Sequence, residues 1–144
     1  MIVKNVVLDS SVIAKWFLPD ETFKSYALKI KEDFVNRKVI VSVPTLIFYE
    51  VSNLLKTAIK RLRINKHIAI KAYQGFLDLN FLVHSSVDLF KTSLEKAIDL
   101  DISSYDAAYV ALAEYLKSPL YTADDNLIKK SKSKLVKSLK DYDN

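Results

Sequence analysis

Residues 2–18 read Ile-Val-Lys-Asn-Val-Val-Leu-Asp-Ser-Ser-Val-Ile-Ala-Lys-Trp-Phe-Leu, and this stretch indicates the fold class. Its first part, 2–8, is a short run rich in β-branched residues, which is typical of a strand. The segment Asp9-Ser10-Ser11 follows, and side chains of these types cap the first turn of a helix. We therefore expect a strand over 2–8 and a helix over 12–18.

The same alternation of strand and helix continues along the chain. Further strands are expected over 39–43, 81–83, 120–122 and 135–136. Helices are expected from the turn at 19–22 to about 36, from 44 to about 61, and over 65–77, 87–100, 103–116 and 126–132. Strands separated by helices require right-handed crossovers, which give a parallel sheet covered on both faces. The sequence therefore predicts one α/β domain over residues 1–144, a three-layer α/β/α sandwich with a central parallel sheet.

The composition excludes several classes of site. The chain has no Cys, so it has no disulfide, no thiolate zinc site and no thiol nucleophile. Its one glycine, Gly75, cannot build the glycine-rich turns of the common nucleotide-binding loops. No apolar run approaches the roughly 18 residues of a membrane span, and the first residues do not resemble a signal peptide. We expect a cytoplasmic protein with no membrane partner. The net charge of +5 fits either a polyanionic partner or a lysine-rich surface.

Three carboxylates lie near the starts of predicted helices. Asp9 and Asp124 follow strands, and ligands of open parallel sheets bind beyond the carboxyl ends of the strands. Asp106 lies three residues after Ser103, which is the spacing of a capping box. Each of these residues can be explained by helix capping alone. The position of these residues therefore leaves a structural and a functional interpretation open.

Glu50 is harder to explain as a structural residue. It lies on the apolar stripe of the helix that follows Pro44, where an unpaired ionised glutamate costs several kcal/mol. Glu50 must therefore reach a cleft, a cationic partner or a metal ion, unless it extends to solvent from the edge of the core. Asn53, one turn further along, either holds this carboxylate by a hydrogen bond or is a surface amide.

Four segments in order resemble the motifs of PIN-domain nucleases, and they extend over nearly the whole chain. The size and pattern look most like VapC toxins of toxin–antitoxin pairs. The four segments are 7–17, 44–46 together with 49–54, 104–113, and 120–124. The resemblance implies a PIN-like fold.

The resemblance also implies which residues form the site. Asp9, Glu50, Asp106 and Asp124 would be the catalytic and metal-binding acids, with the hydroxyls of Ser11 and Thr122 in support. The Thr-x-Asp spacing favours Asp124 as the ligand and leaves the adjacent Asp125 to cap the helix. Further implications are a homodimer, inhibition by a small cognate antitoxin, and structured RNA as the target.

Four converging carboxylates raise one another's pKa, and a divalent cation resolves this repulsion. All-oxygen ligands suit Mg²⁺ or Mn²⁺, whereas two histidines and no cysteine make zinc a poor fit. We assign Asp9 and Asp106 as direct ligands, Asp124 as a second or water-mediated ligand, and Glu50 as a water-mediated ligand or general base. The expected activity is a metal-dependent endoribonuclease that leaves a 5′-phosphate. The alternatives are a nuclease-inactive PIN-like module that binds RNA or protein, and a phosphodiesterase directed at DNA.

Basic and aromatic residues near the motifs suggest partners. The candidate RNA contacts, each of which has a solvated surface residue as its alternative, are Lys15, Lys56, Lys60, Arg61, Arg63 and Lys66. Large apolar residues near the site are Trp16, Phe17 and Phe48. We expect some of these three to lie at a dimer or antitoxin interface, because one small domain has little core in which to bury them.

Overall fold

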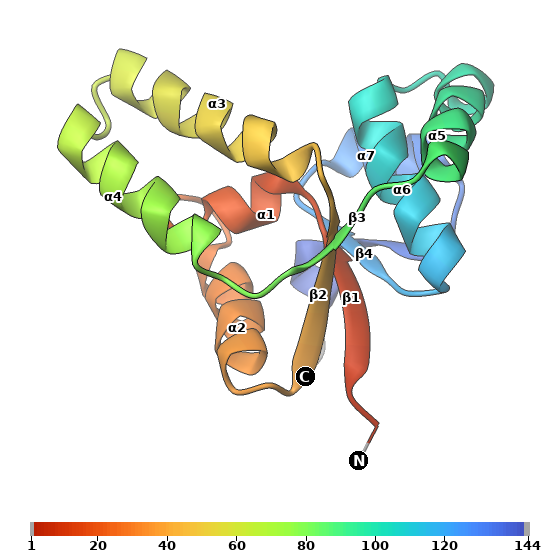
Figure 1. Cartoon of the computed structure of the whole chain (residues 1–144), viewed down its shortest axis with the longest axis horizontal. Coiled ribbons are helices and arrows are strands. Elements are labelled where there is room, and N and C mark those ends of the chain that lie inside the picture. The colour runs from red at the N-terminus through yellow and green to blue at the C-terminus, as the bar shows by residue number, and fades with distance from the viewer. Residues whose placement is uncertain (1, 143–144) are drawn as a thin grey trace.

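The structure is a computed structural model that describes residues 2–142, and in this range five parallel strands form one sheet (Figure 1). The strand order is β3-β2-β1-β4-β5, so β1 lies at the centre. The strands are β1 (Lys4–Leu8), β2 (Val39–Pro44), β3 (Leu82–His84), β4 (Leu120–Thr122) and β5 (Val136–Ser138). The expected parallel sheet of an α/β/α sandwich is confirmed.

Helices cover the sheet from both sides, with α1 to α4 on one side and α5 and α6 on the other (Figure 1). The helices are α1 (Ser10–Ala14), α2 (Lys24–Val35), α3 (Ile47–Lys60), α4 (Lys66–Leu77), α5 (Val87–Leu100), α6 (Ser104–Leu116), α7 (Asp125–Ser131) and the 3-10 helix η1 (Leu139–Asp141). Within residues 2–142, none of these helices combines the length and the apolar character that crossing a bilayer requires.

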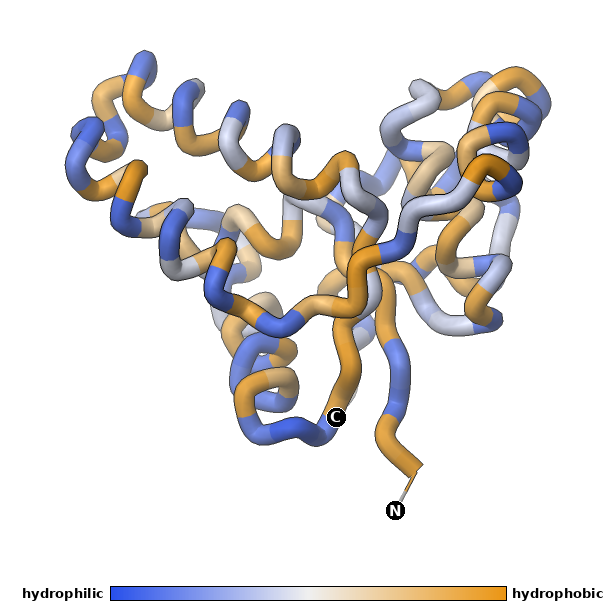
Figure 2. Tube along the Cα trace, viewed as in Figure 1, coloured by the Kyte–Doolittle hydropathy of each residue, from blue (hydrophilic) through white to orange (hydrophobic). Residues whose placement is uncertain are grey.

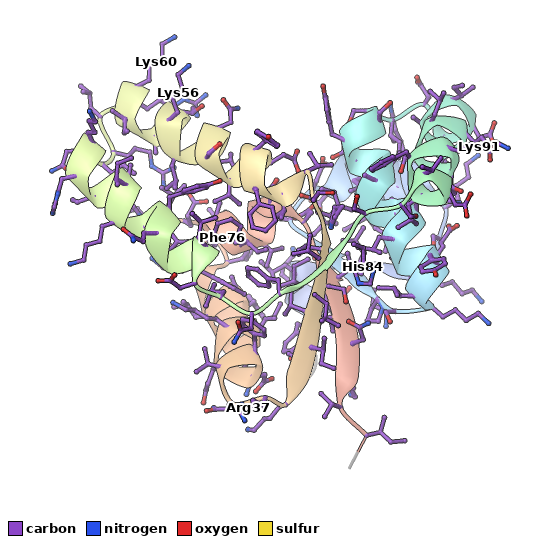
Figure 3. The ribbon with its side chains drawn as sticks, viewed as in Figure 1. Arg37, Lys56, Lys60, Phe76, His84 and Lys91 are labelled. Carbon is purple, nitrogen blue, oxygen red and sulfur yellow. The ribbon has the colours of Figure 1, made fainter. Side chains whose placement is uncertain are left out.

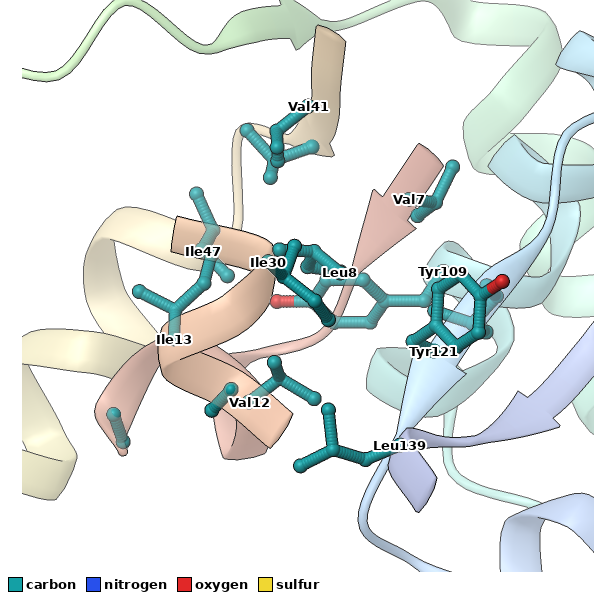
Figure 4. Packing of buried hydrophobic residues seen from close by; sticks show 14 of the residues in the cluster. Val7, Leu8, Val12, Ile13, Ile30, Val41, Ile47, Tyr109, Tyr121 and Leu139 are labelled. Carbon is teal, nitrogen blue, oxygen red and sulfur yellow. The ribbon is translucent and has the colours of Figure 1, made fainter. Parts of the chain in front are cut away.

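The core lies on both faces of the central strands. A strand covered on both faces is a continuous apolar run, and Figure 2 shows this hydrophobic character along β2 and the end of β1. Val7 and Leu8 of β1 are fully buried, as is Val41 of β2. They belong to one hydrophobic cluster with Ile13 of α1 and Ile47 of α3, and Figure 4 shows Val7 on the other side of β1 from these two isoleucines. The core therefore fixes the carboxyl ends of β1 and β2 and the helices that follow them.

Trp16 belongs to this core, so of the three candidate interface residues only Phe17 and Phe48 remain, and for these two the interface stays a prediction. Its side chain is buried, its indole N–H donates to the Ala27 carbonyl over 2.8 Å, and its ring stacks on Phe34. Phe17 and Phe48 are half-buried and both contact Phe76.

Several element boundaries differ from the expected ones. Helix α1 ends at Ala14 instead of at residue 18, and the chain continues in turns. Helix α2 starts only at Lys24, because Asp20 and Phe23 adopt left-handed backbone conformations that interrupt a helix. Pro44 ends β2, where it pairs in register with His84, and does not open α3. The short helix η1 was not expected.

Candidate active site

The strand order creates a crevice at one edge of the sheet. From β1 the chain moves outward through β2 and β3, and it then returns to the other side of β1 to form β4. The connections after β1 and β4 therefore diverge, and a crevice opens beyond the carboxyl ends of these two strands. Asp9 directly follows β1, and Asp124 lies just after β4. The fold thus places both carboxylates at this crevice.

Asp9 caps a helix and is also a buried charge. Its Oδ1 accepts hydrogen bonds from the Ser11 hydroxyl over 2.6 Å and from the Val12 backbone N–H over 3.3 Å. The Thr122 hydroxyl is a third donor. The residue is only 6% exposed, and burial raises its pKa to about 6 even though these hydrogen bonds lower it. The predicted positions of Ser11 and Thr122 beside the acidic residues thus agree with the structure.

Asp124, and not Asp125, caps α7, so the sequence assignment of the cap is wrong. The Asp124 Oδ1 accepts from the backbone N–H groups of Asn126 over 3.0 Å and Leu127 over 3.2 Å. A capping residue needs an extended backbone, and Asp124 has φ −95° and ψ 101°. Asp125 is the first helical residue and is exposed. The Asp124 N–H also donates to the Thr122 hydroxyl over 3.0 Å, which fixes this loop against β4.

Glu50 on α3 is held by a residue that the sequence did not single out for the site. The Tyr109 hydroxyl donates to Glu50 Oε1 over 2.6 Å, and Tyr109 itself is only 1% exposed. Burial raises the pKa of Glu50, and this hydrogen bond lowers it. Asn53 is exposed, and within the described part of the chain it makes no hydrogen bond to Glu50. The one available sequence signal was that Tyr109 lies three residues after Asp106 on the same helix.

Asp106 links the other acids electrostatically. It lies in the first turn of α6, where its N–H donates to the capping Ser103 hydroxyl over 3.0 Å. Burial raises the pKa of Asp106, and the charge of Asp124 raises it further. The charge of Asp106 in turn raises the pKa of Asp9 and of Glu50. The structure therefore brings together the four predicted carboxylates from four separate segments, and Asp106 repels each of the other three.

Asp106 interacts electrostatically with each of the other three carboxylates, but the four do not form a closed cage. Among residues 2–142, no three Asp, Glu, His or Cys side chains are arranged closely enough to hold a metal ion together. Mg²⁺ is commonly held by only one or two carboxylates, with water as its other ligands. The Ser11 hydroxyl accepts from the Ala123 N–H over 3.3 Å and joins the loops after β1 and β4. An open, all-oxygen site on fixed loops fits a partly hydrated hard cation.

The predicted RNA-contacting residues fall into two groups. Lys15 is buried with Glu21 Oε1 at 3.7 Å from its ammonium, and the exposed Arg63 donates to the same Glu21 over 2.7 Å. The others are exposed at the end of α3 and the start of α4, and they are Lys56, Lys60, Arg61 and Lys66. Figure 3 shows Lys56 and Lys60 extending away from α3 into solvent.

Residues 6–133 match the family model of the PIN domain. The chain belongs to the PIN-domain family. It is also similar to Ribonuclease VapC3 of Pyrobaculum aerophilum, with 29% identity over 128 residues that cover 88% of this chain and 94% of the relative. The predicted family is thereby confirmed.

Two solved structures share this PIN-domain fold. The Mycobacterium tuberculosis protein VapC20, described as a sarcin-ricin loop cleaving toxin, superposes with a TM-score of 0.65 at 19% identity, covering 86% of this chain and 93% of that one. VapBC2 from Rickettsia felis, bound to a DNA fragment from their promoter, gives a TM-score of 0.64 at 14% identity, with coverages of 88% and 92%. At these identities the similarity establishes the fold.

Proposed function

We propose that this PIN-domain protein is a divalent-metal-dependent endoribonuclease and the toxin of a VapBC-type pair. The observation that carries the proposal is the buried carboxylate of Asp9 at the switch point of the sheet, coupled to Asp106, which is in turn coupled to Glu50 and Asp124. A buried charge in repulsive surroundings destabilises the fold, so its presence points to a functional role. The ribonuclease name of the similar VapC3 protein supports RNA as the substrate.

The donor set suits Mg²⁺ or Mn²⁺. Asp9 and Asp106 would bind the cation directly, and Asp124 and Glu50 would bind it directly or through water. The bound cation supplies a water of lowered pKa and neutralises charge on the phosphate. The Ser11 and Thr122 hydroxyls keep the Asp9 carboxylate in one orientation, because both donate to it.

Glu50 is the best placed of the four acids to act as a general base. The Tyr109 hydroxyl donates to Oε1 and the Ser10 hydroxyl is a second donor to this carboxylate, so Glu50 is held in place to accept a proton from the attacking water. A raised pKa brings a carboxylate closer to the operating pH, which improves general-base catalysis. The rigid α3 and α6 helices fix the orientation of this pair.

A small antitoxin and a second copy of the chain are the proposed protein partners. The fold similarity to VapBC2, whose two components bind DNA of their promoter, supports an antitoxin partner. RNA phosphates are proposed to contact four exposed residues, Lys56, Lys60, Arg61 and Lys66. The proposed location of the protein and its RNA target is the cytoplasm.

Cleavage of a structured RNA by the purified chain tests the proposal. We expect cleavage with Mg²⁺ or Mn²⁺, none in EDTA, and products with a 5′-phosphate and a 3′-hydroxyl. Asp106→Asn should lower the rate by orders of magnitude, whereas the matched control Asp125→Asn should cleave as wild type does. Full activity in EDTA, or products ending in a cyclic phosphate, would contradict the metal mechanism. Cleavage of a DNA oligonucleotide but not of RNA would contradict the substrate.

A further inference from the structure

An open cavity of about 180 Å³ with a mixed polar and apolar lining lies between α1, the second half of α3 and the turn that precedes α2. It lies beyond the four carboxylates and is lined by apolar side chains of α1 and α3. Its polar lining consists of Ser11, Lys15, Glu21, Thr57, Arg61 and Arg63. The volume is sufficient for a small polyatomic group together with water.

The Lys15 side chain is buried beside this cavity, and its ammonium has no hydrogen-bond partner within the described chain. The side chain is only 7% exposed, and its nearest charged partner is Glu21 Oε1 at 3.7 Å. This distance is too long for a hydrogen bond, and within residues 2–142 Nζ donates none. An ammonium group has three N–H donors. Within residues 2–142 the only fully buried side-chain nitrogen or oxygen without a partner is His84 Nε2, so the Lys15 Nζ is accessible from the cavity that it lines. The cavity is therefore suited to a group that brings acceptor oxygens.

The charges around the cavity favour an anion. Three cationic side chains, Lys15, Arg61 and Arg63, face one carboxylate, that of Glu21. Arg63 already binds Glu21 Oε2 over 2.7 Å and the Pro19 carbonyl over 2.6 Å. Within the described chain, Arg61 has neither a hydrogen bond nor an ion pair. The uncompensated charge at the cavity thus comes from Lys15 and Arg61, and an anion would bind between them.

The cavity adjoins the carboxylate site. Ser11 lines the cavity, and the same hydroxyl donates to Asp9 over 2.6 Å. Leu54, another lining residue, lies one turn after Glu50 on α3. A nucleic-acid strand whose scissile phosphate lies at the acids would pass along α3 toward the cavity, and its next phosphates would meet Lys15 and Arg61.

We propose that this cavity is a phosphate subsite that binds the RNA strand beside the scissile phosphate, with Lys15 and Arg61 as its cationic ligands. The assignment rests on the proposed ribonuclease function. Glu21 is a positioning residue, because it holds Lys15 from one side and Arg63 from the other. Glu21 also limits the affinity of the subsite, since its negative charge opposes that of a phosphate.

Binding of a labelled single-stranded RNA in EDTA, followed by fluorescence anisotropy at several salt concentrations, tests the subsite without cleavage. Lys15→Met keeps the buried stem and removes the charge, and Lys137→Met removes an exposed charge from β5 as the matched control. We expect Lys15→Met to weaken binding about tenfold and to lower the slope of log affinity against log salt by about 0.7. Lys137→Met should bind as wild type does. Glu21→Gln should bind RNA several-fold more tightly.

The Glu21 variant separates the subsite from a structural ion pair. If the pair only stabilises the fold, Glu21→Gln lowers the melting temperature and leaves RNA affinity unchanged, and this result overturns the proposal. So does equal RNA binding by Lys15→Met and Lys137→Met. Lys15-dependent binding of a short polyglutamate peptide without Lys15-dependent RNA binding would assign the cavity to an acidic protein partner instead. Lys15-dependent RNA binding by a wild-type chain that cleaves nothing supports the subsite and contradicts only the nuclease.

Discussion

The buried charge of Asp9 lowers the stability of the fold but is needed to bind the cation, and these two effects can be measured separately. Because burial raises its pKa from 3.8 to about 6, folding takes up a proton between these pH values, and stability falls as pH rises through this window. Above pH 6 the cost is fully present, at about 3 kcal/mol. Asp9→Asn keeps the capping oxygen and removes the charge. In EDTA at pH 8 this variant should therefore unfold at higher denaturant concentration than wild type.

The difference between Asp9→Asn and wild type should disappear near pH 4, where the folded protein already holds the proton. Adding Mn²⁺ at pH 8 should stabilise wild type and leave the variant unchanged, because only the charged site binds the cation. A variant that is less stable than wild type at pH 8 would mean that capping and hydrogen bonding outweigh the buried charge.

Tyr109 offers a second test at the scale of one atom. Tyr109→Phe keeps the buried ring and removes the hydroxyl that donates to Glu50. Since that hydrogen bond lowers the pKa of Glu50, its loss should raise this pKa. The acid limb of the pH–rate profile for RNA cleavage should then move to higher pH. Tyr105→Phe, an exposed tyrosine on the same helix, should leave the profile unchanged, and equal profiles for both variants would contradict the role given to Tyr109.

Some site residues can be recognised from the sequence and others cannot. Glu50 could be found because a carboxylate on an apolar stripe is anomalous by itself. Tyr109 could not, because a tyrosine on a buried helix face is ordinary until its partner on α3 is known. Lys15 was placed among candidate surface contacts for the same reason. Its burial depends on the turn that carries Glu21, which folds back over α1.

The sequence placed the carboxyl ends of α2 to α7 within one residue, and its errors were the end of α1 and the starts of α2 and α3. The usual stop signal is glycine in a left-handed conformation, and this chain uses other residues there. The non-glycine residues with positive φ are Asp20, Phe23, Arg37, Leu62, Asp101, Lys117 and Lys132. The only glycine, Gly75, lies inside α4. The positions of the buried strands were predicted well, because continuous apolar runs do not depend on such local signals.

Lys117, at the end of α6, allows the cost of a left-handed conformation at a residue other than glycine to be measured. It is exposed and has φ 50°, a conformation that costs a residue with a side chain about 1 kcal/mol or more. Lys117→Gly should therefore raise the free energy of unfolding, by about 0.5 kcal/mol after the added flexibility of the unfolded chain is subtracted. Lys117→Ala removes the same side chain but keeps the strain, so its denaturation midpoint should match wild type. A glycine variant that is less stable than the alanine variant would contradict the strain.

At the scale of the whole molecule, the order of the strands brings four motifs that are distant in sequence together in one site. The sequence predicted a parallel sheet but gave no strand order, because buried strands of similar composition can pair in several ways. Only the return of the chain to β4, beside β1, places Asp124 across the crevice from Asp9. The long-range electrostatic coupling of the acids is thus a property of the topology.

The outer face of α5 is the most apolar exposed stripe on the helices, and we expect it to form the homodimer. Its members are Val87 at 79% exposure, Phe90 at 59%, Leu94 at 56% and Ile98 at 70%. The stripe is self-complementary in an antiparallel arrangement, because Val87 of one copy lies opposite Ile98 of the other. Lys91, which extends outward in Figure 3, then lies opposite Glu95 of the second copy. A two-fold interface requires this kind of pairing.

The sequence analysis sought the interface among Trp16, Phe17 and Phe48 because these residues are large and lie near the motifs, but the fold buries Trp16 and half-buries the other two. Leu94→Lys puts a charge at the centre of the α5 stripe, where an ammonium would lose its water on association. Light scattering should give twice the 16.5 kDa chain mass for wild type and a monomer for Leu94→Lys. Leu62→Lys, at an isolated residue that is 93% exposed, should remain a dimer. A monomeric wild type, or a dimer that survives Leu94→Lys, would place the interface elsewhere or remove it.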